Sequence, residues 1–571
     1  MDRTIAWPLV RVRLRGIIAA AIAVAATGHV SAQSEQAGRA HTVLSQAARA
    51  TAPGTVSAPL ADPGLRVQVP RVDPFNASGT DYPDAAGDAI KNGQGGNNGA
   101  RGWIWFGKAC WIASQRRILS IHGPHPADVM GPKGPPPPSP GFFNPYLVIM
   151  GMYDEREHRY TTFEGPLSSD TSHTTKNWPR AVGHGFDNQC YVPTTGELIK
   201  ATVPATYKGY VNPVSGTNYI QPQLARINVS ALVSGNVASG RSGAAYVGSF
   251  PMPAVEADGK GFRTDVTAGA MDYLPKIDRI IHAHKDRFWT IHPVTGVHAP
   301  NHADGISLGF KLPDPARPDF FPIHNIGHYN PTVDKFIYGG GALAPAGYNL
   351  QFVAIDGTSL VVTHLDNSPA TFSMSETNLK SPVQQQYREA KAAASWSASG
   401  GESVFFQDTG AGGTRIFALD TRRPAGQQWR LLPLTLSHEV DYLCPVPDYG
   451  IVVLFTSHSS MAGQATMRVY RHDPTPPQPT VSASGISADT IRVTITPGTG
   501  TGPPAARYEV LRSTSQHGAY APIGTVSHGI GSIVIEDPSL SAGQTRWYEA
   551  RPVGFDAQGP ASAAVSGTTT L

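Results

Sequence analysis

The sequence predicts an all-β protein in which a six- or seven-bladed β-propeller is followed by a C-terminal immunoglobulin-like sandwich. The composition is the first observation, because 60 glycines and 50 prolines stand beside only 15% charged residues in 571 positions. The second is a hairpin-like unit that recurs between residues 101 and 472. The third is a different series of alternating strands over residues 480–571. Four antiparallel strands repeated several times are the pattern of propeller blades.

Residues 1–32 have the pattern of a secretory signal peptide. Four arginines between Arg3 and Arg15 form a basic region, and "IIAAAIAVAA" (17–26) is an apolar run too short to cross a bilayer comfortably. The following "HVSA" offers small residues for cleavage after Ala32. We therefore expect a secreted protein, extracellular or periplasmic, and we find no later segment suited to span a membrane.

The net charge argues against a nucleic-acid partner. The whole chain carries a formal charge of +3. The signal peptide contains four arginines and one aspartate, so basic and acidic residues are equal in number after it. A neutral chain lacks the basic surface that nucleic-acid binding requires.

Two segments of biased composition divide the chain. Residues 33–100 contain "QAARATAPGTVSAPLADPG" and "KNGQGGNNGA", with few large apolar side chains, and are predicted to be disordered or loosely attached. Residues 473–479 are rich in proline and are predicted to be an extended, semi-rigid linker. The linker separates a domain at 101–472 from one at 480–571.

The repeated unit is a short strand, a turn with proline or glycine, and a second strand rich in β-branched or aromatic residues. Its clear copies are "ACWIASQRRILSIHG" (109–123), "GHGFDNQCYVPTTGELIKA" (183–201), "AGAMDYLPKIDRIIHA" (268–283) and "IGHYNPTVDKFIYGGG" (326–341), with weaker copies at 394–408 and 442–456. Second hairpins such as "RFWTIHPVTGVH" (287–298) follow most copies. Six units are counted, and a seventh made of terminal strands stays open.

These repeats resemble a known family. "YVPTTGELIKA", the later "RFWTIHPVTG" and the glycine run "YGGG" (338–341) together are similar to kelch-like propellers of the galactose-oxidase type. The resemblance covers 101–472 and implies a funnel-shaped face where the innermost strands begin. It also implies a copper-radical oxidase, but the Tyr-His dipeptide of that copper site occurs nowhere in this sequence, so copper is not supported.

The C-terminal domain has its own resemblance. Between turns, its segments alternate apolar and polar residues, as half-buried strands do. The run "GQTRWYEARPV" (543–553) and the following "DAQGPAS" resemble the penultimate strand and terminal hairpin of a fibronectin type III module. The resemblance implies that Tyr548 is a corner tyrosine whose hydroxyl bonds to the backbone.

Polar residues at the beginnings of the predicted inner strands are the candidate site. The catalytic candidates are Arg180, His184, Tyr191, His328 and Tyr329. The ligand-binding candidates are Asp187, Arg263, His324, His438 and Asp441. A histidine or tyrosine could act as the base at a sugar C5 proton, while arginine neutralises a uronate carboxylate. The alternative for each histidine is a hydrogen bond between blades.

Metal and thiol chemistry rest on fewer residues. His282 and His284 are two apart and share one face of a strand, so they could hold a divalent metal, or they could face solvent. Cys110, Cys190 and Cys444 allow one disulfide with an odd thiol, or they are buried small hydrophobes. No C-x-x-C pair indicates a structural zinc site.

Three functions follow from these patterns. The leading expectation is a secreted propeller that binds an extracellular polysaccharide or other glycan through its funnel. The first alternative is a polysaccharide-degrading enzyme of the lyase type. The second is an adhesion or protein-interaction scaffold that uses its fibronectin type III domain. Serine esterases and zincins lack support, because neither G-x-S-x-G nor H-E-x-x-H occurs.

Overall fold

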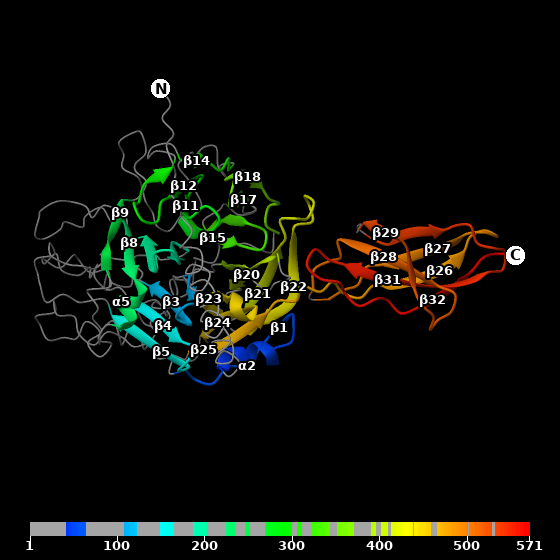
Figure 1. Ribbon diagram of the computed structural model, residues 1–571, viewed down its shortest axis with the longest axis horizontal. Coiled ribbons are helices and arrows are strands. Elements are labelled where there is room, and N and C mark those ends of the chain that lie inside the picture. Colours follow the sequence, from blue (N-terminus) through cyan, green and yellow to red (C-terminus); the bar gives the residue numbers. More distant parts are fainter. Residues whose placement is uncertain are drawn as a thin grey trace, which may run out of the picture.

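The structure is a computed structural model, and most of its described residues lie in antiparallel β-sheets (Figure 1). It describes residues 42–63, 108–122, 149–164, 187–201, 223–234, 246–251, 269–299, 305–310, 323–342, 351–369, 390–394, 401–408, 413–437, 439–457, 465–500, 502–527 and 531–571. Within these ranges, every helix is too short or too polar to span a membrane.

Ahead of residue 472, the described residues form six antiparallel sheets that follow one another along the chain, and we number them one to six. Sheet one contains β2 (Cys110–Ile112), β3 (Arg117–His122), β4 (Ile149–Asp154) and β5 (Arg159–Glu164). Sheet two contains β6 (Gln189–Val192), β7 (Glu197–Ala201), β8 (Gln223–Asn228) and β9 (Tyr246–Pro251). Sheet three contains β10 (Gly269–Leu274), β11 (Arg279–His284), β12 (Arg287–Ile291), β13 (His298–Ala299) and β14 (Ile306–Ser307).

The remaining three sheets repeat this order. Sheet four contains β15 (Ile323–Asn330), β16 (Lys335–Ala342), β17 (Phe352–Asp356) and β18 (Val362–His364). Sheet five contains β19 (Ala390–Ala394), β20 (Ser403–Asp408), β21 (Thr414–Leu419) and β22 (Trp429–Leu436). Sheet six contains β23 (Glu439–Val446), β24 (Ile451–Ser457), β25 (Ala465–Arg471) and, outermost, β1 (Thr55–Val56).

The first strands of the six sheets contact one another in a closed circle. The order is β2, β6, β10, β15, β19, β23 and back to β2. Figure 1 shows the sheets arranged around a common centre. We call this part of the chain the ring. Its core lies between neighbouring sheets, because successive residues of a strand face opposite sides. Met271 of β10 packs against Cys190 of sheet two, whereas its neighbour Ala270 packs with Tyr338 of sheet four.

The turn between the first and second strands has a recurring backbone. Its last residue has a positive φ at Gly196 (69°), Asp278 (49°) and Asp334 (53°). Glycine adopts this left-handed conformation without a steric penalty, and aspartate tolerates it better than most residues. Pro275 and Pro331 begin two of these turns, where their fixed φ favours the bend.

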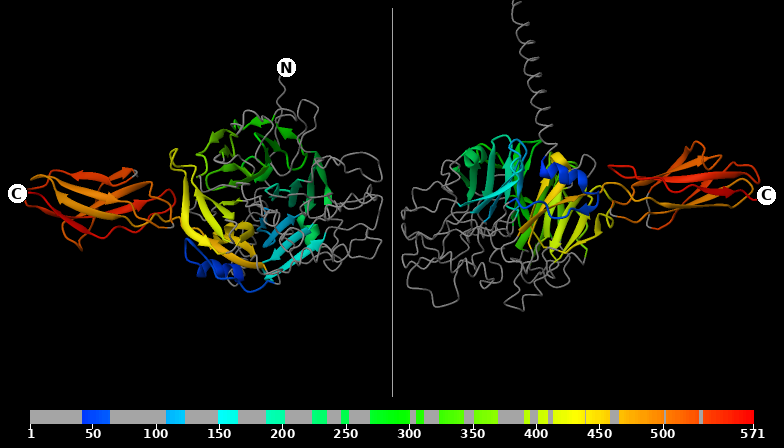
Figure 2. Two further views of the ribbon diagram at one scale, coloured as in Figure 1. Left: turned by 180° about the vertical axis from the view of Figure 1, so that it is seen from behind. Right: turned by 90° about the horizontal axis from the view of Figure 1, so that it is seen from below.

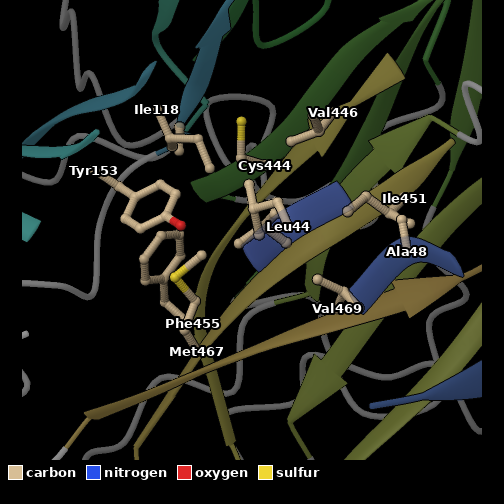
Figure 3. Packing of buried hydrophobic residues seen from close by; sticks show 12 residues of the cluster. Leu44, Ala48, Ile118, Tyr153, Cys444, Val446, Ile451, Phe455, Met467 and Val469 are labelled. Carbon is tan, nitrogen blue, oxygen red and sulfur yellow. The ribbon is translucent and has the colours of Figure 1, made fainter. Parts of the chain in front are cut away.

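Residues 42–63 correct the expectation that 33–100 is disordered or loosely attached. They form α2 (Val43–Ala50), which Thr42 caps by accepting a hydrogen bond from the Ser45 amide, and then β1. Leu44 is fully buried in the core between sheets six and one (Figure 3). Figure 2 shows α2 beside sheet six. The rest of 33–100 lies outside the described residues.

Two further helices are short and lie in connections. The helix α5 (Val229–Ser234) directly follows β8, and the 3-10 helix η5 (Pro447–Tyr449) joins β23 to β24. Gln115 of sheet one donates a hydrogen bond to Ser230 of α5. Both helices therefore help to join sheet one to its neighbours in the ring.

A two-sheet sandwich follows the ring. One sheet has the order β26 (Thr480–Gly485), β27 (Ile491–Thr496) and β30 (Ile533–Asp537). The other has the order β29 (Ala521–Ser527), β28 (Arg507–Ser513), β31 (Thr545–Val553) and β32 (Val565–Thr568). Tyr548 is buried between them, and its hydroxyl donates to the Asp537 carboxylate at 2.6 Å. This corrects the expected bond to the backbone, because the buried carboxylate is the acceptor at hand.

Candidate functional site

A lysine crosses the middle of the ring. Lys108 precedes β2 of sheet one, and its Nζ donates to the Met271 carbonyl at 3.1 Å and forms an ion pair with Asp272, both in sheet three. Sheet two separates these sheets along the circle, so the side chain reaches across the centre. The same Asp272 carboxylate accepts a hydrogen bond from the Tyr329 amide of sheet four at 2.8 Å. One carboxylate thus joins three sheets.

Asp187 makes a second set of contacts between the sheets. It precedes β6, and its carboxylate accepts a hydrogen bond from the Gly327 amide of sheet four at 2.8 Å. Its carbonyl accepts another from the Met271 amide at 2.8 Å. Burial raises the pKa of Asp187 to about 6, although the nearby Lys108 charge acts in the opposite direction. Asp187 therefore lies directly before an innermost strand, as the sequence predicted. Its carboxylate is already hydrogen bonded to sheet four.

Lys200 of β7 is a buried polar residue that the sequence analysis missed. Its side chain is fully enclosed, and burial lowers its pKa to about 7, while the neighbouring Cys110 and Asp187 act in the opposite direction. The signal in the sequence is one lysine inside the short apolar strand "ELIKA". A lysine with this pKa changes its charge near neutral pH, unlike an ordinary surface lysine.

The three cysteines lie on innermost strands of consecutive sheets in the circle. Cys444 belongs to sheet six, Cys110 to sheet one and Cys190 to sheet two, and all three are buried free thiols. Burial raises the pKa of Cys110 to about 12 and raises the other two pKa values well above their ordinary range. They act as small buried hydrophobes, which was one of the two alternatives from the sequence.

His328 and Tyr329 are neighbours on β15 but project to opposite faces of the sheet. The Nε2 of His328 is hydrogen bonded to the Ser403 hydroxyl of sheet five at 2.8 Å. Burial lowers the pKa of His328 to about 3, so its imidazole is neutral. Tyr329 donates its hydroxyl proton to Asp334 at 2.7 Å, and burial raises its pKa well above the usual range. Neither group is poised as a base at neutral pH.

The Tyr329 bond is one copy of a repeated turn contact. In sheet three, Tyr273 donates to Asp278 at 2.7 Å with the same separation of five residues. Both aspartates are the residues with positive φ that end their turns. The Tyr-x-x-x-x-Asp spacing is visible in the sequence and could have indicated this role for Tyr329.

Neighbouring turns are also bonded to each other. Thr194 of sheet two donates to Asp278 of sheet three at 3.0 Å. Lys276 of sheet three donates to Asp334 of sheet four at 2.9 Å. The turns therefore form a connected row of contacts along this face of the ring.

Tyr329→Phe is expected to lower the free energy of unfolding by about 1 to 2 kcal/mol, because a buried hydrogen bond to a carboxylate is lost. Ligand binding should be unchanged, since the hydroxyl is already engaged with Asp334. Chemical denaturation measures the first effect, with Tyr273→Phe as the matched change in the next sheet. A variant of undiminished stability that loses polysaccharide cleavage would instead identify Tyr329 as a base.

The two histidines proposed for a metal lie side by side inside sheet three. His282 and His284 are both buried on β11, with ring centroids 6.4 Å apart, and His282 also stacks on Trp289. They share a face, as their spacing predicted, but that face is packed and does not lie in solvent. Burial lowers the pKa of His282 to about 3. Across the described ranges, no group of three His, Cys, Asp or Glu side chains is arranged to hold a metal ion.

The other candidates are placed only in part. Tyr191 is half-buried on β6. His324 belongs to β15 and Asp441 to a bulge of β23, which are innermost strands of sheets four and six. The remaining candidates lie outside the described residues: Arg180, His184, Arg263 and His438.

Comparison with known proteins adds a likeness for one part of the chain. No protein-family model matches it, and no curated protein does. Among solved structures, an Fn3-like protein from Clostridium thermocellum is 28% identical with a TM-score of 0.15, over 17% of this chain and 95% of that chain. The FN5 domain of Drosophila Lar is 18% identical with a TM-score of 0.14, over 17% and 98%.

A third similar structure is the sixth fibronectin type III domain of human fibronectin type III domain containing protein 3. It is 18% identical with a TM-score of 0.14, over 17% of this chain and 86% of that chain. TM-scores this low carry no argument about the ring or about activity. The described chain is thus mostly β-sheet, and its structural neighbours are fibronectin type III domains.

Proposed function

We propose that the six sheets are the blades of a six-bladed β-propeller of the kelch-like, galactose-oxidase type, and that the sandwich is a fibronectin type III module. Two features support the propeller. The first three strands of each sheet are neighbours in chain order, with β1 completing sheet six, and the first strands of the sheets contact one another in a circle. The strand order of the two sandwich sheets supports the module. The sequence left open a seventh blade made of terminal strands. The N-terminal strand β1 instead forms the outermost strand of sheet six.

We infer that the protein is secreted and binds an extracellular glycan on the face of the ring where the innermost strands begin. The observation that carries this proposal is the difference between the two faces. In every sheet except sheet five, four-residue turns join the first and second strands, such as 193–196, 275–278 and 331–334. Apart from the two residues between sheets five and six, longer stretches join one sheet to the next, such as 165–188 and 252–268, and they start and finish at the opposite ends of the strands.

Long connections on a rigid scaffold are where binding residues concentrate. Arg180, His184 and Asp187 belong to the connection 165–188, and Arg263 belongs to 252–268. Guanidinium and imidazole groups suit the hydroxyls and carboxylates of sugars. The turns on the other face are already bonded to one another, which leaves them less free to serve a ligand.

The secreted form of the full chain should bind at least one acidic or neutral polysaccharide on a glycan array. His184→Ala is expected to weaken that binding about tenfold or more. A tenfold change corresponds to about 1.4 kcal/mol, the loss of one charged or polar contact. His517→Ala is the matched control, because His517 is exposed on the sandwich. Silence across the array, or an equal loss in both variants, would contradict the proposal.

The lyase alternative gains no support from the described residues. Of its four candidate bases, His328 and Tyr329 are engaged in hydrogen bonds, Tyr191 is half-buried, and His184 lies outside the described residues. We therefore expect binding without cleavage. Incubation with uronate-containing polysaccharides should produce no ultraviolet absorbance of unsaturated products, and a rise in that absorbance would favour the lyase.

A further inference from the structure

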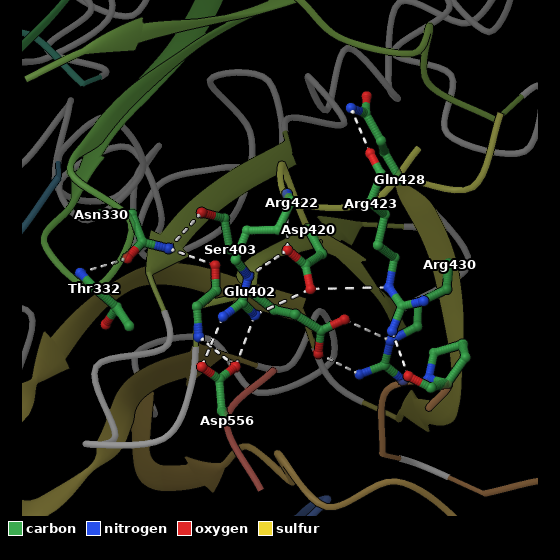
Figure 4. Close-up of polar contacts among 12 residues, drawn as sticks. Asn330, Thr332, Glu402, Ser403, Asp420, Arg422, Arg423, Gln428, Arg430 and Asp556 are labelled. Atoms are coloured by element: carbon green, nitrogen blue, oxygen red, sulfur yellow. Dashed lines mark hydrogen bonds and ion pairs between the residues drawn. The ribbon is translucent and has the colours of Figure 1, made fainter. Parts of the chain in front are cut away.

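One end of the sandwich is bonded to sheet five of the ring. Arg422 lies between β21 and β22 and donates from two nitrogens to the Asp556 carboxylate of the sandwich, at 2.6 and 2.7 Å (Figure 4). Asp420 holds the same guanidinium from the ring side at 2.8 Å. The Gly401 amide donates to Asp556 at 3.0 Å. The Asp556 carboxylate thus accepts hydrogen bonds from Arg422 and Gly401, and Asp420 already holds Arg422 in position.

Two further arginines of sheet five bind the main chain of the sandwich. Arg430 forms a paired ion contact with Glu402, at 2.8 and 2.6 Å, and donates a third hydrogen bond to the Gly502 carbonyl at 3.1 Å. Arg423 donates to the Pro504 carbonyl. Because Glu402 orients Arg430 beforehand, the contact loses little side-chain freedom when it forms.

An aromatic side chain completes the contact. The guanidinium of Arg422 lies 4.7 Å from the ring centroid of Phe555, which directly precedes Asp556. Cation–π contacts of this kind add to the ion pair where water is partly excluded. The side chains of Arg422 and Asp556 are 23% and 12% exposed, so solvent screens the pair less than it screens a surface pair.

The linker packs against the sandwich and does not hang free. A Cβ placed at Gly559 would lie 2.1 Å from the Pro476 carbonyl, and one at Gly498 would lie 2.1 Å from the Gln478 carbonyl. Such close approach is open only to glycine. The linker residues therefore follow the surface of the sandwich, which removes the freedom that a flexible hinge would need.

These contacts involve the end of the sandwich where partner-binding loops lie in related architectures. Residues 502–504 belong to the loop between β27 and β28, and residues 555–556 to the loop between β31 and β32. In immunoglobulin variable domains, the two equivalent loops belong to the antigen-binding end. Here both loops contact sheet five.

We propose that this loop end is a docking surface for the ring, which holds the sandwich as a rigid arm in one orientation. A protein partner of the sandwich then binds to the surfaces left free, away from these two loops. This inference is independent of glycan binding, because it rests on contacts between the two units alone. It assigns the fibronectin-like module a structural role at its loop end.

Distance measurements between two spin labels test the rigid arm in the full chain. Val361→Cys places one label on sheet four and Val534→Cys places the other on the sandwich, at positions 60% and 50% exposed. The three native thiols are buried and stay unlabelled. We expect a single narrow distance distribution, and a broad one when Asp556→Ala is added.

Glu536→Ala is the matched control, because it breaks an exposed ion pair with Arg492 inside the sandwich and leaves the ring contacts intact. It should leave the distribution narrow. Arg422→Ala removes the same contact from the ring side and should also broaden the distance distribution. Because this change leaves the sandwich sequence intact, it distinguishes loss of docking from unfolding of the sandwich. A broad distribution in the parent, or narrow distributions in both the Asp556 and Arg422 variants, would overturn the proposal.

Discussion

Glu155→Leu is expected to lower the free energy of unfolding of the ring by about 3 to 5 kcal/mol, the cost of breaking a buried ion pair from one side. The Glu155 side chain is fully buried. It accepts hydrogen bonds from the Thr42 hydroxyl at 2.6 Å, the Tyr449 hydroxyl at 2.6 Å and the Arg116 Nε at 2.9 Å. Without the carboxylate, two half-buried hydroxyls and the buried guanidinium of Arg116 lose their acceptor, and the charge of Arg116 is left uncompensated.

Denaturant unfolding followed by tryptophan fluorescence measures this effect. Glu157→Leu is the matched control two residues away, because Glu157 is 55% exposed and pairs only with an exposed Arg159. Exposed pairs of this kind contribute little to stability. Tyr449→Phe removes one donor of the three and should have a smaller effect. Equal losses in Glu155→Leu and Glu157→Leu would show that the buried contacts do not hold the ring together.

The position of Glu155 explains the expected size. Thr42 belongs to the N-terminal segment, Arg116 to sheet one and Tyr449 to the connection within sheet six. These segments meet where the last sheet of the circle contacts the first. The outermost strand of sheet six, β1, also comes from the N-terminal segment. Closure of the ring therefore depends on residues at both ends of its chain, and Glu155 bonds them to one another.

The sequence predicted the local parts of this fold but not that the N-terminal segment 42–63 packs on the ring and completes sheet six. The hairpins at 183–201, 268–283 and 326–341 were predictable because turn and strands are adjacent in the chain. The segment 42–63 was misjudged because its small residues have the composition of disordered chains. Its helix is stabilised by packing of Leu44 against distant strands, which no local pattern encodes.

The candidate site was likewise predictable only in part. Asp187 was predicted at the beginning of an inner strand, and it lies there. Its partner Gly327 is 140 residues away, and the Lys108–Asp272 pair spans 164, so neither contact could be derived from spacing. His328 was predicted as a polar inner residue, but only its bond to Ser403 shows that it serves packing between sheets. Types of residues are readable in a sequence, whereas their partners require the fold.

The pH dependence of stability should include an alkaline limb, a rise above neutral pH, that comes from the buried Lys200. The folded-state pKa of Lys200 is lowered to about 7 from its ordinary 10.5, so between these values the unfolded chain binds more protons and stability rises with pH. The folded-state pKa of Asp187 is raised to about 6 from 3.8, so in that window the folded chain binds more protons and stability falls as pH rises. The lowered pKa values of His282 and His328, about 3 against an ordinary 6.5, make stability rise with pH over the same acid window and oppose the Asp187 effect. The rise above pH 7 is therefore the feature that we assign to Lys200.

Lys200→Met is expected to remove the alkaline limb and to stabilise the protein at neutral pH. A pKa lowered from 10.5 to about 7 corresponds to at most roughly 5 kcal/mol, at about 1.4 kcal/mol for each pH unit. Methionine fills a similar volume without a charge to desolvate, and such replacements of buried charges are often stabilising. The pKa of Asp187 should move to slightly higher pH, because the charge of Lys200 lowers it in the parent protein.

Thermal unfolding between pH 5 and 10 gives the profile directly. Lys276→Met is the control, because Lys276 is 57% exposed and its pair with Asp334 lies at the surface, so the alkaline limb should persist. A Lys200→Met protein that is less stable than the parent at pH 7, or that keeps the rise between pH 7 and 10, would contradict the role given to this lysine. Greater stability of Lys200→Met at pH 7 would mean that the ring holds this buried lysine at a cost in stability.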